Sequence, residues 1–186
     1  MPLKLPKPKM ILLSAAGLTV VYFGGCYLMA RNYISPIRFA TTDRPPFLAE
    51  ATIANGKYDI PVWQTRGLSS DNPKQDVFIM VHGYGGDRSV WNNLAAQFEH
   101  SAEIVIPATM GQTESPAPRV GFGLGESDEI LTIATWVKSK NPASRIHLVG
   151  VSMGGSACWI AAGKHPELFE SVISGGGFCP SRLGDR

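Results

Sequence analysis

Cysteine is scarce in this sequence, and the motifs built on it are missing. Only three cysteines occur among 186 residues, and none belongs to a Cys-x-x-Cys pair. No metal site is expected, and no cofactor is implied. Cys158 and Cys179 are compatible with two buried thiols or with one disulfide in an oxidising compartment, and inert buried thiols are the favoured interpretation.

Repeats and phosphate-binding patterns are missing as well. The sequence has no internal repeat, no low-complexity tract and no Gly-x-x-x-x-Gly-Lys-Ser/Thr motif. Its length suits one domain with an appendage, and its 44% apolar residues are enough for a hydrophobic core.

Charged residues are few, at 17%, and nearly balanced, with a net charge of +2. Lys4, Lys7 and Lys9 precede every acidic residue, so the remaining 14 of the 17 bases face 15 acids. A nearly neutral body offers no electrostatic surface for nucleic acid, and a nucleic-acid partner is therefore not expected.

One long run of residues carries no charge at all. The 21 residues from Met10 to Ala30 are uncharged, and Lys9 and Arg31 bound the run. As a helix the run would be about 31 Å long, which matches the hydrocarbon core of a bilayer. Core helices of soluble proteins seldom extend this far without a polar position, so the run predicts a transmembrane helix.

The flanking charges predict how this helix is oriented. Three lysines precede it and one arginine follows it, which favours a cytoplasmic N-terminus and an extracytoplasmic body held by a single-pass signal anchor. A cleaved signal peptide is disfavoured because the end of the run, at 28–30, fits the small-x-small cleavage pattern poorly. An acylated Cys26 in a lipoprotein motif is a less favoured alternative, because Phe23 stands where an aliphatic residue is usual.

The chain divides into four segments by composition. Residues 1–9 are a basic cytoplasmic N-terminus, 10–30 the signal anchor, 31–47 a proline-containing linker and 48–186 a folded domain. Asn55-Gly56 lies between two β-prone runs and predicts a tight hairpin of antiparallel strands at the start of that domain.

Apolar runs and helical periodicity alternate through the folded domain. Strands are expected at 76–81, 103–106, 145–151 and 171–174, and helices at 89–98, 127–138 and 153–164. This alternation predicts an α/β fold with an open, mainly parallel sheet and helices on both faces.

The segment Leu148–Gly155, LVGVSMGG, places a serine between two glycines where an expected strand meets an expected helix. In a Gly-x-Ser-x-Gly turn the serine is held in a strained conformation, and Gly150 and Gly154 keep bulk away from the crowded turn. Ser152 is therefore a candidate nucleophile. A glycine-rich turn with an incidental serine, or a phosphate-binding loop, is the alternative.

A second glycine-rich segment, His82-Gly83-Tyr84-Gly85-Gly86, follows an earlier strand. Acyl transfer places negative charge on a carbonyl oxygen, and two fixed backbone N–H groups can stabilise it. The Met153 N–H, next to the nucleophile, and the Tyr84 N–H are the expected donors. A simple tight turn is the alternative for this segment.

VHGYGG, followed about 65 residues later by LVGVSMGG and preceded by an Asn-Gly hairpin, resembles the α/β-hydrolase superfamily of serine esterases, lipases and peptidases. The resemblance covers about residues 50–180. It includes the segment KHPELF, Lys164–Phe169, which looks like the end of the helix that follows the serine turn in that family. It implies that Ser152 is the nucleophile, that Met153 and Tyr84 form the oxyanion hole, and that His82 and Gly83 support the loop. The segment Pro107–Ser115 departs from the family's Asp-x-Arg-Gly-x-Gly-x-Ser loop, so its role is not implied.

The resemblance also requires an acid and then a histidine after the serine, which this sequence does not supply. His165 and Asp185 follow Ser152 in the wrong order. His82 is expected to support the oxyanion loop, His147 to be a satisfied core residue and His100 to be solvated. The acids at 126, 128 and 129 are expected to complement a helix dipole.

About six strands are expected, whereas the family usually has eight. The chain is thus expected to be the N-terminal part of a membrane-anchored serine hydrolase, truncated after the sixth strand and inactive alone. Its expected substrate is a small-molecule ester or related acyl compound, hydrophobic ones included. A catalytically inactive α/β-hydrolase-like binding protein at the membrane is the alternative. The sequence does not predict an oligomeric state.

Overall fold

A computed structural model describes residues 8–36, 38, 40–41, 43–66 and 76–178. It divides the chain into two compact units, Met1–Ser35 and Pro36–Arg186. Cys179 and Asp185 lie outside the described residues, so the expectations about them are not addressed.

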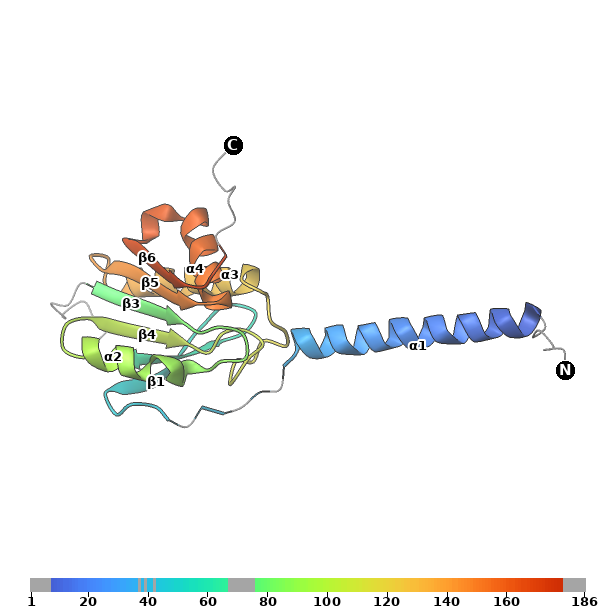
Figure 1. The fold of residues 1–186 in the computed structure, drawn as a ribbon. Coiled ribbons are helices and arrows are strands. Elements are labelled where there is room, and N and C mark those ends of the chain that lie inside the picture. The colour runs from blue at the N-terminus through green and yellow to red at the C-terminus, as the bar shows by residue number, and fades with distance from the viewer. Residues whose placement is uncertain (1–7, 37, 39, 42, 67–75, 179–186) are drawn as a thin grey trace. The chain divides into compact units, whose positions relative to one another are not determined.

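The described part of the first unit is a helix, α1, from Pro8 to Ile34 (Figure 1). Within it, Leu12–Ile34 is long and apolar enough to cross a membrane, although a signal sequence near the N-terminus would meet the same criterion. The helix is longer than the uncharged run, because it also includes Lys9 and the four residues after Ala30.

The second unit is built on a six-stranded sheet in the order β1-β2-β4-β3-β5-β6. The strands are β1 (Leu48–Ile53), β2 (Ile60–Thr65), β3 (Asp76–Val81), β4 (Glu103–Pro107), β5 (Arg145–Val151) and β6 (Ser171–Gly175). Strands β3 to β6 are parallel, whereas β1 and β2 pair antiparallel with their neighbours. The sheet is therefore mixed, with a parallel part whose carboxyl ends share one edge (Figure 1).

Helices cover both faces of this sheet, as expected (Figure 1). The short 3-10 helix η1 (Arg88–Trp91) and α2 (Asn92–Phe98) pack on one face, and α3 (Leu124–Lys140) and α4 (Met153–Lys164) on the other. A second 3-10 helix, η2 (Pro166–Leu168), follows α4. Because both faces are covered, the parallel strands are apolar along most of their length.

The hairpin that opens the domain has a longer connection than the sequence predicts. β1 and β2 are antiparallel, but Ile53 pairs with Ile60, so six residues separate the strands instead of the Asn-Gly pair alone. Both isoleucines are buried, and burial fixes the register. The Asn55 side chain accepts a hydrogen bond from Thr132 on α3 at 2.9 Å, which ties the loop to that helix.

Two helices begin differently from the sequence expectation. α3 begins at Leu124, three residues early, because the Glu126 carboxylate accepts the backbone N–H groups of Gly121 at 2.8 Å and Gly123 at 2.7 Å and so orders the turn before the helix. The helix expected at 89–98 is divided into η1 and α2, and the Asp87 carboxylate caps η1 through the Ser89 N–H at 2.7 Å.

The described residues of the segment 36–47, which the sequence analysis assigns to a proline-containing linker, are bonded to the body. The Arg38 guanidinium donates to the backbone carbonyls of Ser115 and Ala117. The Thr41 N–H donates to Glu114, and Asn92 on α2 donates to the Asp43 carbonyl at 2.7 Å. This segment is therefore a strap that lies on the domain.

A buried arginine, Arg88, connects three separate segments of the domain. The Arg88 side chain is 2% exposed, and its guanidinium lies 2.9 Å from Glu50 on β1 and 3.3 Å from Glu114. It also lies over the Trp63 ring at 4.4 Å. One cation thus connects η1, the first strand and the loop after β4.

We expect Arg88→Ala to lower the free energy of unfolding by about 3 kcal/mol, because it leaves two carboxylates without their buried partner and removes the stacking on Trp63. Arg44→Ala, at a half-exposed site 3.9 Å from Glu50, should cost much less. Urea unfolding of the two variants in detergent measures both changes. Equal losses would show that the buried pairing is not important.

Candidate active site

Ser152 occupies the sharp turn between β5 and α4. Its backbone angles are φ 52° and ψ −121°, a left-handed region that a residue with a side chain seldom adopts. The Ser152 N–H donates to the Gly175 carbonyl at 2.7 Å, which fixes the turn to the end of β6. The residue is exposed, so its hydroxyl is accessible at the edge where the parallel strands end.

The glycines around this serine are required by close backbone contacts. A Cβ on Gly150 would lie 2.5 Å from the Gly154 carbonyl oxygen, and a Cβ on Gly154 would lie 2.3 Å from the Val81 carbonyl oxygen. Real Cβ atoms essentially never approach this closely. Strand β3, strand β5 and helix α4 therefore meet backbone to backbone under Ser152.

The second glycine-rich segment lies directly against the serine. A Cβ on Gly83 would be 3.1 Å from the Ser152 Cβ and 3.2 Å from the Val151 carbonyl oxygen. Within the segment, the Gly86 N–H donates to the Gly83 carbonyl at 3.2 Å and the Gly85 N–H donates to the Gln112 side chain. The fold thus brings together two motifs that lie about 65 residues apart in the sequence.

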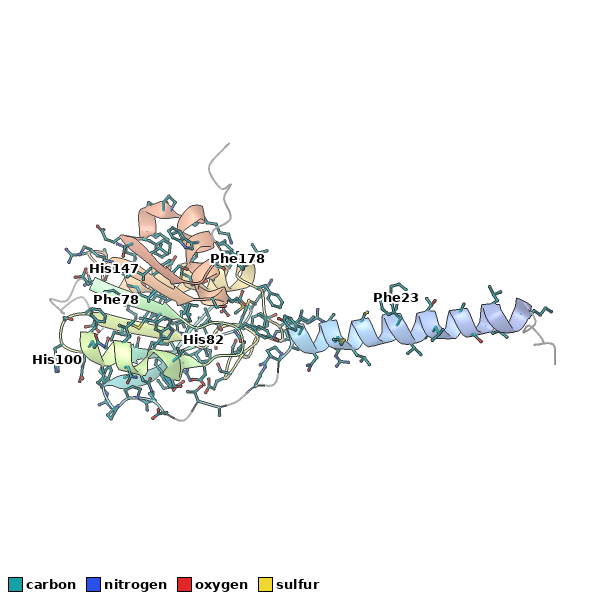
Figure 2. All side chains as sticks on the ribbon, in the orientation of Figure 1. Phe23, Phe78, His82, His100, His147 and Phe178 are labelled. Carbon is teal, nitrogen blue, oxygen red and sulfur yellow. The ribbon has the colours of Figure 1, made fainter. Side chains whose placement is uncertain are left out.

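His82 lies within the body of the domain (Figure 2). It is fully buried and is bonded on both ring nitrogens. Nδ1 lies 3.0 Å from the Gly83 carbonyl oxygen, which only accepts, so Nδ1 carries the hydrogen. Nε2 then accepts from the Thr109 hydroxyl at 3.1 Å. Burial is the main cause that lowers the pKa of His82, which keeps the ring neutral.

Thr109 and Gln112 extend this contact into a buried chain of hydrogen bonds. The Gln112 amide donates to the Thr109 hydroxyl at 3.0 Å, while its carbonyl oxygen accepts the Gly85 N–H. The chain runs from His82 through both side chains back to the glycine-rich segment. The loop that departs from the family pattern, Pro107–Ser115, therefore supports that segment.

Glu129 on α3 also holds the loop Pro107–Ser115 in place. The Glu129 carboxyl accepts the Met110 N–H at 2.9 Å and is 4% exposed. Burial, with a smaller contribution from the nearby Glu126 charge, raises the pKa of Glu129 to about 8. Gly125 leaves room for the Met110 side chain, since a Cβ there would lie 2.2 Å from the Met110 sulfur.

Residues 76–182 match the family model described as the alpha/beta hydrolase fold. The chain belongs to the α/β-hydrolase family. It is 29% identical over 121 residues to Lipase 1 of Psychrobacter immobilis, an alignment that covers 65% of this chain and 36% of that protein. It spans about a third of the length of the curated lipases that it matches.

Solved structures of other proteins share the fold. An esterase of Pyrococcus furiosus superposes with a TM-score of 0.64 at 18% identity over 78% of this chain and 56% of the esterase. A bacterial membrane phospholipase A superposes with a TM-score of 0.57 at 20% identity over 94% of this chain and 53% of that protein. At these identities the likeness concerns the fold.

None of the four histidines of this α/β-hydrolase is placed as a base for Ser152. Both ring nitrogens of His82 are bonded behind the glycine-rich segment. His100 and His147 lie where the parallel strands begin (Figure 2), and the five residues from His147 to Ser152 span about 16 Å of strand. His165 ends α4, about 20 Å of helix away, and bonds to Glu167 at 2.9 Å.

His147 and the acids near α3 have structural partners. His147 bonds to Ser171 at 2.8 Å and to Asp76 at 3.0 Å and stacks on Phe78, so it is satisfied as expected. Asp128 pairs with Lys164 at 2.6 Å. Sequence reasoning assigned Glu129 to the helix dipole and missed its inward position, where it is buried and accepts the Met110 N–H. Cys158 is a buried thiol whose pKa burial raises to about 12.

We expect Thr109→Val to destabilise the domain by about 2 kcal/mol, because it leaves the buried Gln112 amide without its partner. It also removes the hydroxyl that donates to the His82 Nε2, which then keeps only the longer contact with the Thr109 N–H at 3.4 Å. Thr135→Val is the matched control, since that hydroxyl is exposed and bonds only to the Leu131 carbonyl of its own helix. Urea unfolding compares the two. An equal effect at both sites would contradict the supporting role of Thr109.

The raised pKa of Glu129 predicts a decline of stability with pH. The folded domain binds the proton more tightly than the unfolded chain, so the contribution is complete below pH 4.5 and is lost as pH rises to about 8. Over that window the slope is about 1 kcal/mol per pH unit. Glu129→Gln, which keeps the acceptor for Met110, should flatten the slope in urea unfolding measured across the window, and an unchanged slope would refute the assignment.

Proposed function

We propose that this chain is part of a membrane-anchored serine hydrolase that cleaves carboxylic esters or related acyl compounds. The observation that carries the proposal is the Ser152 turn, in which an exposed serine with φ 52° lies against the Gly83 backbone at the carboxyl edge of the sheet. Matches to lipases and the fold of esterases support an ester as substrate.

In the proposed reaction the Ser152 Oγ attacks the acyl carbon while its proton passes to a base. The base returns this proton to the leaving oxygen as the bond to the alcohol breaks, and water then hydrolyses the acyl-serine, which releases the acid and restores the serine hydroxyl. The negative charge on the acyl oxygen would be stabilised by backbone N–H groups of Met153 and Tyr84. Met153 is the first residue of α4, where N–H groups have no acceptor within the helix.

Hydrogen bonds within and around the glycine-rich segment support it as the carrier of the second donor, Tyr84, because they fix its backbone. The Gly85 and Gly86 N–H groups already donate to Gln112 and Gly83. The His82–Thr109–Gln112 chain holds the segment in place, so His82 acts as a positioning residue. A preorganised segment of this kind stabilises the oxyanion without reorganising during the reaction.

We infer that the catalytic acid and histidine are supplied by residues outside this chain. The positions of the four histidines support this inference, as does the greater length of the lipases that match. Among the described residues β6 pairs only with β5, so its other edge could accept a further parallel strand. The chain alone should then turn over little or no substrate.

We further propose that α1 is a single-pass signal anchor with the hydrolase domain outside the cytoplasm. Its length and apolar composition support membrane insertion, and Lys4, Lys7 and Lys9 support a cytoplasmic N-terminus. A lipid-modified Cys26 is the alternative anchor. The mass of the mature N-terminus distinguishes an intact chain from one that begins at an acylated Cys26.

A fluorophosphonate probe tests the proposed nucleophile. The protein extended by its downstream coding sequence should be labelled, and Ser152→Ala should abolish labelling, because the probe bonds only to an activated hydroxyl. Ser156→Ala is the matched control: it lies one turn along α4, its Oγ accepts the Phe178 N–H, and its loss should leave labelling in place. Labelling that persists in Ser152→Ala would refute the nucleophile, and unlabelled extended protein would favour the inactive binding module.

A further inference from the structure

The loop 116–124 presents apolar side chains to solvent beside the candidate active site. Phe122 is 47% exposed and Leu124 is 64% exposed. The Phe122 ring stacks on Tyr84 at 5.9 Å between ring centres, and Gly123 lies against the first turns of α4, within 3.6 Å of the Ser156 Cβ when a Cβ is built on it. The loop is therefore part of the same edge as Ser152.

Phe122 is held in this position by a strained backbone. Its φ is 49°, which is a genuine outlier for a bulky residue and costs free energy. The buried Glu126 carboxylate accepts the N–H groups of Gly121 and Gly123 on either side of it. The buried Glu126 carboxylate thus holds the backbone on both sides of Phe122. The Phe122 side chain stays exposed, although an apolar side chain of this size would be more stable if buried.

The strap bonds to the backbone immediately before this loop. Arg38 donates to the carbonyls of Ser115 and Ala117, immediately before residues 116–124. Only four peptide units separate Arg38 from Ile34, the last residue of α1, so the chain between them spans at most about 14 Å. Covalent reach alone therefore keeps the Arg38 backbone close to a bilayer that holds α1.

From these observations we propose that Phe122 and Leu124, with the exposed Arg119 beside them, insert into the surface of the bilayer that holds α1. Aromatic and aliphatic side chains next to a cation are the combination that interfacial segments use, with apolar groups at the acyl boundary and the cation among phosphates. The edge that carries Ser152 then faces the lipid. This inference rests on the proposed anchor and hydrolase function.

The proposed docking names a substrate class for the site. A serine at a membrane-facing edge meets acyl esters whose chains already lie in that bilayer, so membrane lipids are its substrates.

Tryptophan fluorescence in vesicles tests the docking. The full chain is reconstituted in phosphatidylcholine–phosphatidylglycerol vesicles whose acyl chains are brominated or not, and Phe122→Trp is compared with Ala143→Trp. The new ring at position 122 keeps an aromatic partner for Tyr84. Ala143 is an exposed residue in the loop before β5, at the opposite edge of the sheet.

We expect brominated lipid to quench the fluorescence added at position 122 about twofold or more and to leave that at 143 unchanged, because interfacial side chains lie about 5–10 Å inside the headgroup boundary. Chain that floats with vesicles but shows no quenching at 122, or equal quenching at both positions, overturns the docking and leaves the anchor standing. Chain that does not float overturns the anchor and the docking together. The hydrolase proposal fails separately, if Ser152 is not labelled by the probe.

Discussion

Close contact of three backbones under Ser152 is the constraint on which the candidate site depends. The end of β3, the end of β5 and the start of α4 meet at Gly150 and Gly154, where a Cβ would lie within 2.5 Å of a carbonyl oxygen. This contact forces the serine into its left-handed conformation, which costs free energy. Burial of apolar side chains on both faces of the sheet offsets that cost. The position of the exposed Ser152 hydroxyl therefore depends on the packing of the whole sheet.

A second layer of polar contacts stabilises the loops around that turn. His82, Thr109 and Gln112 hold the glycine-rich segment, and Glu129 holds the loop that carries the last two. Buried polar groups of this kind are stable only when each has a partner, so the contacts depend on one another. Arg88 and the strap add a third connection, from Glu114 to the first strand.

The α/β fold could be predicted from the sequence, because apolar runs of strand length alternate with segments of helical periodicity. The place of the candidate site could be predicted as well, because both glycine-rich motifs follow expected strands. The length of the β1–β2 connection did not follow, because burial of Ile53 and Ile60 sets the register and overrides Asn55-Gly56. Thr109, Gln112 and Glu129 were not identified, since polar residues in an irregular loop have no periodic signal. Their roles come from tertiary contacts between segments far apart in the chain.

The central claim is that Ser152 is acylated during turnover. The most direct test mixes the protein, extended by its downstream coding sequence, with an activated ester, quenches it in acid and locates the bound acyl group by peptide mass spectrometry. The account predicts an acyl group on the peptide that contains Ser152 and on no other peptide. An acyl group on another residue, with Ser152 unmodified while the ester is consumed, would contradict it.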